Sequence, residues 1–175
     1  MANTNEFMNE VTSRFVNITH TFDAPRELVF NAWTDVKQLE RWYAPRGCTI
    51  NFTQFNFREG GAFHSCIKSP HYHDCWCKGI YQEIIAPERI IFSMHIADEK
   101  GNLLQPKDAG MDEEWPAETI VTVTFKEYEG KTILTLRQTV AESIAKRTGA
   151  YPSWINMFDR LAEDLHIHKT SLTSI

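Results

Sequence analysis

The chain has 175 residues, of which 42% are hydrophobic and 12% aromatic, a composition typical of one globular domain with a sizeable core. Its formal net charge is −5, from 18 basic and 23 acidic residues, and no short window is dominated by Lys or Arg. Because nucleic acids and anionic membranes are bound through clustered cations, we expect neither as a main partner.

Residues 1–12 are polar and lack the basic and apolar segments of a secretory signal, and no apolar run reaches membrane-spanning length. We therefore expect a cytoplasmic protein whose four cysteines are free thiols: Cys48, Cys66, Cys75 and Cys77. A disordered tail over 1–12, a single domain over 13–168 and a C-terminal tail over 169–175 are predicted.

The N-terminal third of the domain is predicted to form a strand, two short helices and a second strand. Alternating apolar and polar residues predict a strand over 13–22. Pro25 opens a short helix, and a second one is predicted over 35–43. The following strand, over 48–58, needs a shift in register to keep its Phe residues on one face.

The middle of the chain predicts a series of hairpins. Strands are expected over 62–68, 75–85 and 89–97, joined by short connections rich in Gly or Pro. Residues 98–117 contain Gly, Pro and many charges and predict one long loop, a kind of segment that is often functional. Strongly β-branched sequences then predict strands over 118–129 and 131–140.

The last element is predicted to be a long amphipathic helix with Ser153 as its N-cap. Its apolar positions recur at helical spacing, at Trp154, Met157, Phe158, Leu161 and Leu165. Strands in hairpin succession form an antiparallel sheet, and one long helix must cover its apolar face. A curved sheet around a single helix leaves space between the two, which predicts an α+β fold with a ligand cavity.

Several segments in this order resemble the AHSA1-like (activator of Hsp90 ATPase homologue 1-like) family of the START/Bet v 1-like superfamily. The matching stretches are FDAPRELVFNAWTD (22–35), LERWYAPRG (39–47), FREGGAF (57–63), KGIYQEIIAPERIIFS (78–93), TVTF (122–125), TLRQ (135–138) and WINMFDRLAEDL (154–165). The resemblance implies the helix-grip fold, a curved seven-stranded antiparallel sheet wrapped around a long C-terminal helix, with two short helices after the first strand. It implies a cavity between helix and sheet, and it carries over no catalytic residue.

The binding of a small hydrophobic molecule in that cavity is the function that we predict. Large apolar side chains near the expected cavity are the candidate ligand-binding residues, each of which has plain core packing as its alternative. They are Trp42, Tyr43, Phe63, Trp76, Phe92, Met94, Trp154 and Phe158.

The stretch SPHYHDCWCKG (69–79) places His and Cys at alternate positions, a composition that suggests a soft metal. If Cys66 lies near Cys75, then His64, Cys66, Cys75 and Cys77 become cross-strand neighbours. Four parallel side chains on a sheet approximate a rectangle rather than the tetrahedron that zinc prefers. We therefore predict no metal site and no cofactor, with a site that borrows His71 or His73 from the loop kept as the alternative. A strained Cys75–Cys77 disulfide is not expected.

The pairing of apolar residues between the predicted strands over 62–68 and 75–85 predicts which face of these strands lines the cavity. It places Phe63, Ile67, Trp76 and Ile80 inside and the thiols of Cys75 and Cys77 outside. Lys78 and Gln82 would then also point inward, and a bulge near Gly79 would resolve that conflict.

Candidate acids and bases are few: Glu83, His95, Glu118 and Asp159. None has a partner that the sequence makes adjacent, so we predict no catalytic residue and favour a binding protein over an enzyme. Two alternatives remain, a cyclase- or hydrolase-type enzyme using the same cavity and an Hsp90-type chaperone-associated module. A homodimer is also kept as an alternative.

Overall fold

The computed structural model describes residues 14–172, with side chains as far as residue 167. The predicted tail over 1–12 lies outside the described residues, and the last helix continues through part of segment 169–175. The elements are β1 (Val16–Phe22), α2 (Arg26–Asn31), α3 (Val36–Trp42), β2 (Thr49–Phe55), β3 (Ala62–Lys68), β4 (Cys75–Ile85), β5 (Arg89–Ile96), the 3₁₀ helix η1 (Pro106–Ala109), β6 (Glu118–Tyr128), β7 (Lys131–Gln138), α4 (Glu142–Thr148) and α5 (Ala150–Leu172).

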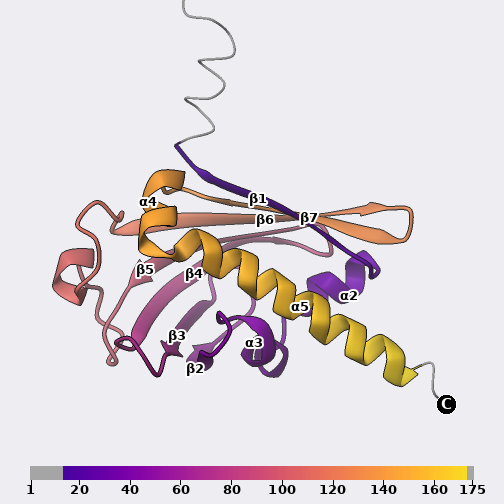
Figure 1. Ribbon diagram of the computed structural model, residues 1–175, viewed down its shortest axis with the longest axis horizontal. Coiled ribbons are helices and arrows are strands. Elements are labelled where there is room, and N and C mark those ends of the chain that lie inside the picture. The colour runs from indigo at the N-terminus through magenta and orange to yellow at the C-terminus, as the bar shows by residue number, and fades with distance from the viewer. Residues whose placement is uncertain (1–13, 173–175) are drawn as a thin grey trace, which may run out of the picture.

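The seven strands form one antiparallel sheet in the order β1-β7-β6-β5-β4-β3-β2. Strands β2 to β7 follow one another as a meander, and β1 pairs with β7 along its whole length, from Val16 opposite Gln138 to Phe22 opposite Thr132. Helix α5 crosses the sheet diagonally, and α2 and α3 lie near its C-terminal half (Figure 1). The predicted α+β helix-grip fold, with its long C-terminal helix and two short helices after the first strand, is confirmed.

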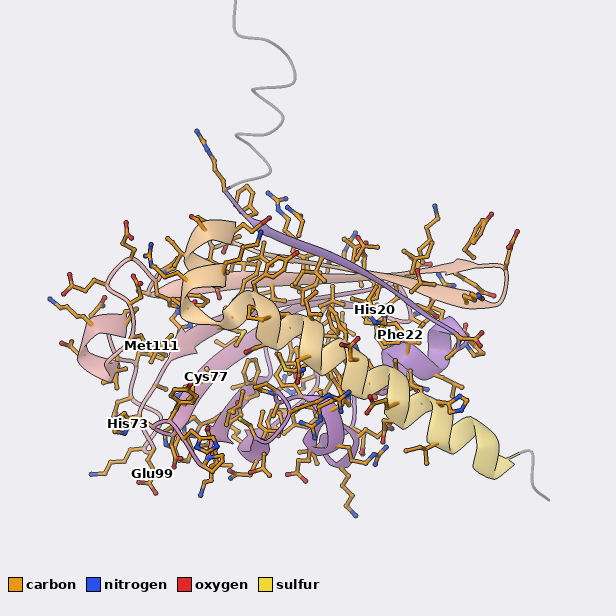
Figure 2. All side chains as sticks on the ribbon, in the orientation of Figure 1. His20, Phe22, His73, Cys77, Glu99 and Met111 are labelled. Carbon is orange, nitrogen blue, oxygen red and sulfur yellow. The ribbon has the colours of Figure 1, made fainter. Side chains whose placement is uncertain are left out.

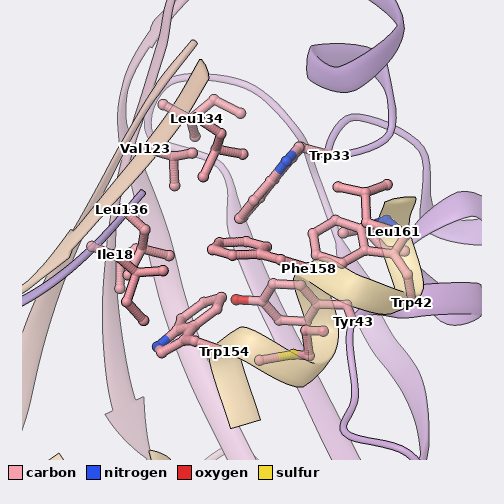
Figure 3. Packing of buried hydrophobic residues seen from close by; sticks show 14 of the residues in the cluster. Ile18, Trp33, Trp42, Tyr43, Val123, Leu134, Leu136, Trp154, Phe158 and Leu161 are labelled. Atoms are coloured by element: carbon pink, nitrogen blue, oxygen red, sulfur yellow. The ribbon is translucent and has the colours of Figure 1, made fainter. Parts of the chain in front are cut away.

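The core lies between α5 and the sheet. Phe158 and Leu161 are fully buried on the inner side of α5. In Figure 3, Phe158 lies between Leu136 of β7 and Val123 of β6 on one side and Leu161, which is next to Trp42, on the other. Each fully buried side chain of this size contributes about 1.5–3 kcal/mol to folding, so this contact is a large part of the fold's stability. No helix in the described part of the chain is both long and apolar enough to cross a bilayer.

Polar contacts fix the C-terminal half of α5 against α3. The guanidinium of Arg41 donates to both carboxylate oxygens of Asp164, at 2.8 and 3.1 Å. In return, Arg160 of α5 donates to the carbonyl oxygen of Arg41 at 2.7 Å. Bidentate pairs of this kind fix orientation as well as distance, so the direction of α5 over the sheet is set at this end.

The beginning of α5 differs from the prediction. The helix starts at Ala150, directly after Gly149, whose φ of 85° ends the unpredicted helix α4 in a left-handed turn. The Ser153 hydroxyl donates to the carbonyl oxygen of Gly149 at 2.7 Å and does not cap the helix. The prediction of Ser153 as N-cap was therefore wrong, because the helix begins after Gly149 and its first turn already contains Pro152 and Ser153.

The register of β3 and β4 corrects the predicted inner face. Phe63 lies opposite Gly79 and Ile67 lies opposite Cys75, so these four positions share the inner face with Cys77. The inward prediction for Phe63 and Ile67 is confirmed, and the outward one for the two thiols was wrong. Trp76 and Ile80 lie on the outer face, where the side chain of Ile80 is 48% exposed.

The cause of this error is the position of the bulge in β4. The strand pairs Tyr81 with Phe92 and then Glu83 with Ile91, so the extra residue is Gln82 and not one near Gly79. A bulge reverses the alternation of side chains, so Ile84 packs against the core although Ile80 does not. The register shift predicted for the strand over 48–58 is confirmed, and it lies between Phe52 and Gln54 of β2.

Gly79 allows the sheet to pack closely where β3, β4 and β5 meet. A Cβ atom at this position would lie 1.9 Å from the carbonyl oxygen of Ser93 and 2.5 Å from the Phe63 ring. The backbone carbonyl cannot move away without breaking the ladder between β4 and β5.

We predict that Gly79→Ala lowers the free energy of unfolding by about 1–3 kcal/mol, the range of an overpacked core. Chemical denaturation of both proteins measures the difference. The matched control is Gln82→Ala, an exposed position of the same strand, which should stay within about 0.5 kcal/mol of the parent. Equal stability of Gly79→Ala and the parent would contradict the close approach described above.

Candidate ligand-binding site

A cavity of about 330 Å³ lies between the first turns of α5 and the inner face of the sheet. The connections 69–74 and 98–117 contribute further parts of its wall, and Tyr72, which is 82% exposed, lies at its rim. Figure 2 shows His73, Cys77 and Met111 together at this end of the molecule, with His20 and Phe22 at the other. The cavity therefore occupies the end of the sheet that is opposite to the Arg41–Asp164 contact.

The wall of the cavity is mostly apolar and uncharged. Among the described residues that form it, none is Asp, Glu, Lys or Arg. Its apolar part comes from aromatic, aliphatic and sulfur-containing side chains, including Ile67, Met94, Ile96, Met111, Trp115, Trp154 and Met157. A wall of this kind favours an apolar ligand, because a charged one would lose its hydration without gaining a partner.

A short chain of hydrogen bonds crosses one side of the cavity. The Trp154 indole N–H donates to Oε1 of Gln138 at 2.9 Å, and the amide nitrogen of Gln138 donates to the Thr119 hydroxyl at 3.0 Å. Gln138 and Thr119 are both buried, at 2% and 1% exposure. The three groups satisfy one another, which orients the Trp154 ring and holds a hydroxyl in the cavity wall.

Tyr43 separates the cavity from the aromatic core. It is the C-cap residue of α3, and its ring packs against Trp154 with centroids 5.7 Å apart, edge to face. Figure 3 shows the two side chains next to each other below Phe158. Burial raises the pKa of the Tyr43 phenol well above its ordinary value, and the nearby Tyr81 and Cys77 add to this effect. The phenol is therefore neutral and can donate a hydrogen bond.

Cys75 and Cys77 form a pair of thiols on the inner face of β4. The interaction between the two thiols lowers the pKa of Cys75 and, together with burial, raises the pKa of Cys77 well above its ordinary value. Cys75 is therefore the more acidic of the two. Both residues line the cavity, as does Cys48 from the segment after α3.

Three of the eight predicted ligand-binding residues line this cavity: Tyr43, Met94 and Trp154. Trp42 and Phe158 are fully buried in the core instead. The Trp42 indole N–H donates to the carbonyl oxygen of Ala32 at 3.1 Å, so this residue braces α2 against α3 and does not reach a cavity mouth.

The other three residues lie elsewhere. Phe63 and Phe92 line a separate void of about 20 Å³, which is the size of one water molecule. Trp76 stacks on His64 on the outer face of the sheet, with ring centroids 4.9 Å apart. The expectation that Trp76 faces the cavity was wrong, because the bulge at Gln82 shifts the alternation of β4.

The same register separates the four residues considered as a zinc patch. His64 and Cys66 lie on the outer face of β3, whereas Cys75 and Cys77 lie on the inner face of β4. His64 is held by the Thr53 hydroxyl at 2.6 Å from Nδ1 and by the carbonyl oxygen of Asp98 at 3.0 Å from Nε2. Within residues 14–172, no three His, Cys, Asp or Glu side chains are grouped as metal ligands.

Each of the candidate acids and bases lies close to a side chain of a complementary kind. Glu83 pairs with Arg89 on the sheet surface, and the His95 imidazole lies 2.9 Å from Glu118. Asp159 lies 3.6 Å from Nε2 of His20, far from the cavity. His95 contributes to the cavity wall, but the alternation of β5 directs its imidazole to the face opposite Met94.

Two segments that sequence reasoning did not connect meet at the cavity. Met111 and Trp115 come from the long loop 98–117, and Thr148 and Ala150 come from the junction of α4 and α5. Arg147 joins them, because its guanidinium donates to both carboxylate oxygens of Asp112, at 2.7 and 3.0 Å, and to Glu114. The unusual length of the loop was the signal in the sequence, while α4 left no clear pattern.

Arg147→Ala is predicted to loosen the loop over the cavity. The guanidinium holds the pKa of the Asp112 carboxyl below its usual range, so this contact stabilises the fold above that range and is lost as pH falls through the lowered value. In the variant the Asp112 pKa should rise, and the amides of Met111 and Trp115 should exchange faster with solvent. Lys146→Ala, which removes the pair with Glu142 and a cation–π contact with Tyr151 but leaves Asp112 untouched, is the control and should change neither quantity. NMR titration and hydrogen exchange measure both, and an unchanged Asp112 pKa in Arg147→Ala would contradict the assignment.

Solved structures from several bacteria share this fold. A protein from Arthrobacter aurescens is 24% identical, with 87% of this chain and 86% of that one covered and a TM-score of 0.73. A protein from Mycobacterium smegmatis is 20% identical over 87% and 91% of the two chains, with a TM-score of 0.74. The AHSA1 protein from Silicibacter pomeroyi is 16% identical over 88% and 99%, with a TM-score of 0.68. No curated protein matches the chain.

The family comparison agrees with the fold and with the segments that define it. The model of the family described as "Activator of Hsp90 ATPase homolog 1-like protein" matches residues 23–166, which run from the entry into α2 to the last described turns of α5. The chain belongs to this family.

Proposed function

We propose that the protein binds a small, mostly apolar molecule in the cavity beside the first turns of α5. The observation that carries this proposal is a cavity of about 330 Å³ between α5 and the sheet whose wall contains no Asp, Glu, Lys or Arg among the described residues. Its volume is at the lower end of the range of small-molecule sites, about 300–1,000 Å³. Tyr43, Met94 and Trp154 are the predicted ligand-binding residues that lie in its wall.

The polar groups in the wall favour a ligand with one hydrogen-bond acceptor. The Tyr43 phenol is kept neutral by burial, and the Thr119 hydroxyl accepts from Gln138 and keeps its own proton to donate. A single carbonyl, ether or hydroxyl oxygen on an apolar skeleton matches this arrangement. A carboxylate matches it poorly, because the described wall offers no cation to pair with it.

A cytoplasmic location is part of the proposal. All four cysteines are free, and the partly exposed pair Cys75 and Cys77 lies near the cavity mouth. Free thiols at such a position persist in a reducing compartment and oxidise in a secretory one.

The proposal is tested by a screen of apolar compounds for an increase in unfolding temperature. A ligand at 100 times its dissociation constant should add about 2.7 kcal/mol to the stability. Ala150→Phe places a ring in the cavity and should abolish the gain. Ile155→Phe makes a comparable change on the exposed side of the same helix and should keep it. If both variants respond like the parent, the ligand binds elsewhere.

A different outcome of the same screen would favour the chaperone alternative. The chaperone alternative rests on the description of the family, which names an activator of Hsp90 ATPase. If this alternative holds, the protein should stimulate the ATPase activity of Hsp90 and should not respond to apolar ligands. The enzyme alternative predicts consumption of the ligand, which mass spectrometry of the recovered compound detects.

Tyr43→Phe tests the hydrogen-bonding part of the proposal. Removal of the phenol oxygen should weaken a carbonyl-containing ligand by about 0.5–1.5 kcal/mol, or roughly threefold to tenfold in affinity. A hydrocarbon of the same shape should bind the variant as well as the parent, which makes it the matched control. Calorimetric titration measures both, and an equal loss for the two ligands would show that Tyr43 acts only through packing.

A further inference from the structure

The sulfur atoms of the protein gather around one cavity. Within residues 14–172, every Cys and Met except Cys66 contributes to the cavity wall: Cys48, Cys75, Cys77, Met94, Met111 and Met157. An apolar ligand needs only an apolar wall, which Leu, Ile and Val supply equally well. The concentration of sulfur is therefore a feature that the binding of an apolar molecule does not explain.

Two of these sulfur atoms are arranged as a pair of donors. Cys75 and Cys77 are two positions apart on β4, so both side chains project into the cavity from the same face. Residues i and i+2 of a strand are roughly 6.6 Å apart along the strand, and the two thiols project side by side from one face of β4. Two collinear metal–sulfur bonds of about 2.3 Å each span roughly 4.6 Å, a separation that lies within reach of rotations about the two Cα–Cβ bonds.

The surroundings of this pair select among metals. Zinc in a structural site takes four donors, and no third Cys, His, Asp or Glu joins the pair within the described residues. Hard cations such as Mg²⁺ and Ca²⁺ require carboxylate or carbonyl oxygens, and the described wall contains no carboxylate. Thiolate and thioether sulfur atoms instead favour Cu(I), a soft ion that is satisfied by two or three sulfur donors.

We propose that Cys75 and Cys77 bind one Cu(I) ion at the sulfur-lined wall of the cavity. The ion takes the place of the thiol protons, which are released to solvent, and its oxidation state does not change. The thioethers of Met94, Met111 and Met157 keep the surroundings soft and exclude water. This site goes beyond the proposed function and does not depend on an apolar ligand being present.

The test is an anaerobic titration of the full, reduced chain with Cu(I) in competition with bicinchoninate, a chromophoric Cu(I) chelator. One ion should bind per chain. Cys75→Ser and Cys77→Ser should each lower the affinity by about 100-fold or more, because each removes one of two donors. Cys66→Ala is the matched control, since this thiol lies on the outer face of β3, and its affinity should stay within about threefold of the parent.

X-ray absorption at the copper edge of the loaded parent protein gives an independent readout that does not rely on variants. A first shell of two or three sulfur atoms is expected, and a shell of nitrogen or oxygen would overturn the proposal. Circular dichroism and thermal unfolding establish that each variant is folded. Binding by folded Cys75→Ser that equals the parent, or weak binding by the parent itself, would show that the thiols only fill space. A failed screen of apolar compounds together with normal Cu(I) binding would reject the proposed function alone.

Discussion

The packing of α5 across the concave face of the sheet is the contact on which the rest of the structure depends. Phe158 and Leu161 are fully buried under the helix, and the Arg41–Asp164 pair fixes the C-terminal half of the helix against α3. A straight helix cannot follow a twisted, curved sheet along its whole length. The cavity lies where the first turns of α5 are separated from the sheet, beside Ala150 and Trp154.

The chemistry of the cavity depends on one extra residue in β4. Because Gln82 is a bulge, the residues before it present Cys75, Cys77 and Gly79 to the inside and Trp76 to the outside. Without this bulge, the apolar pattern of the strand would place Trp76 in the cavity and the thiols in solvent. A local irregularity thus exchanges an aromatic wall for a sulfur-containing one, and it separates His64 and Cys66 from the other two candidate metal ligands.

The sequence predicted the fold well and the site only in part. Strand order, the two short helices and the long C-terminal helix follow from hydrophobic periodicity, which is a local property of the chain. Tyr43, Met94 and Trp154 line the cavity, but the sequence named them within a larger set of apolar residues, most of which fill the core. The meeting of the loop residues Met111 and Trp115 with the α4–α5 junction was not predicted, because it depends on the long-range contact of Arg147 with Asp112 and Glu114.

Local patterns in the sequence specify the interior of this protein as strands with alternating apolar residues and a helix with one apolar stripe. Which of these side chains border the cavity follows from contacts between distant segments. The outcome depends on the position of the bulge at Gln82, on the direction of α5 and on the ion pairs that hold segment 98–117 in place. Each of these couples residues far apart in the chain, so no local pattern specifies it.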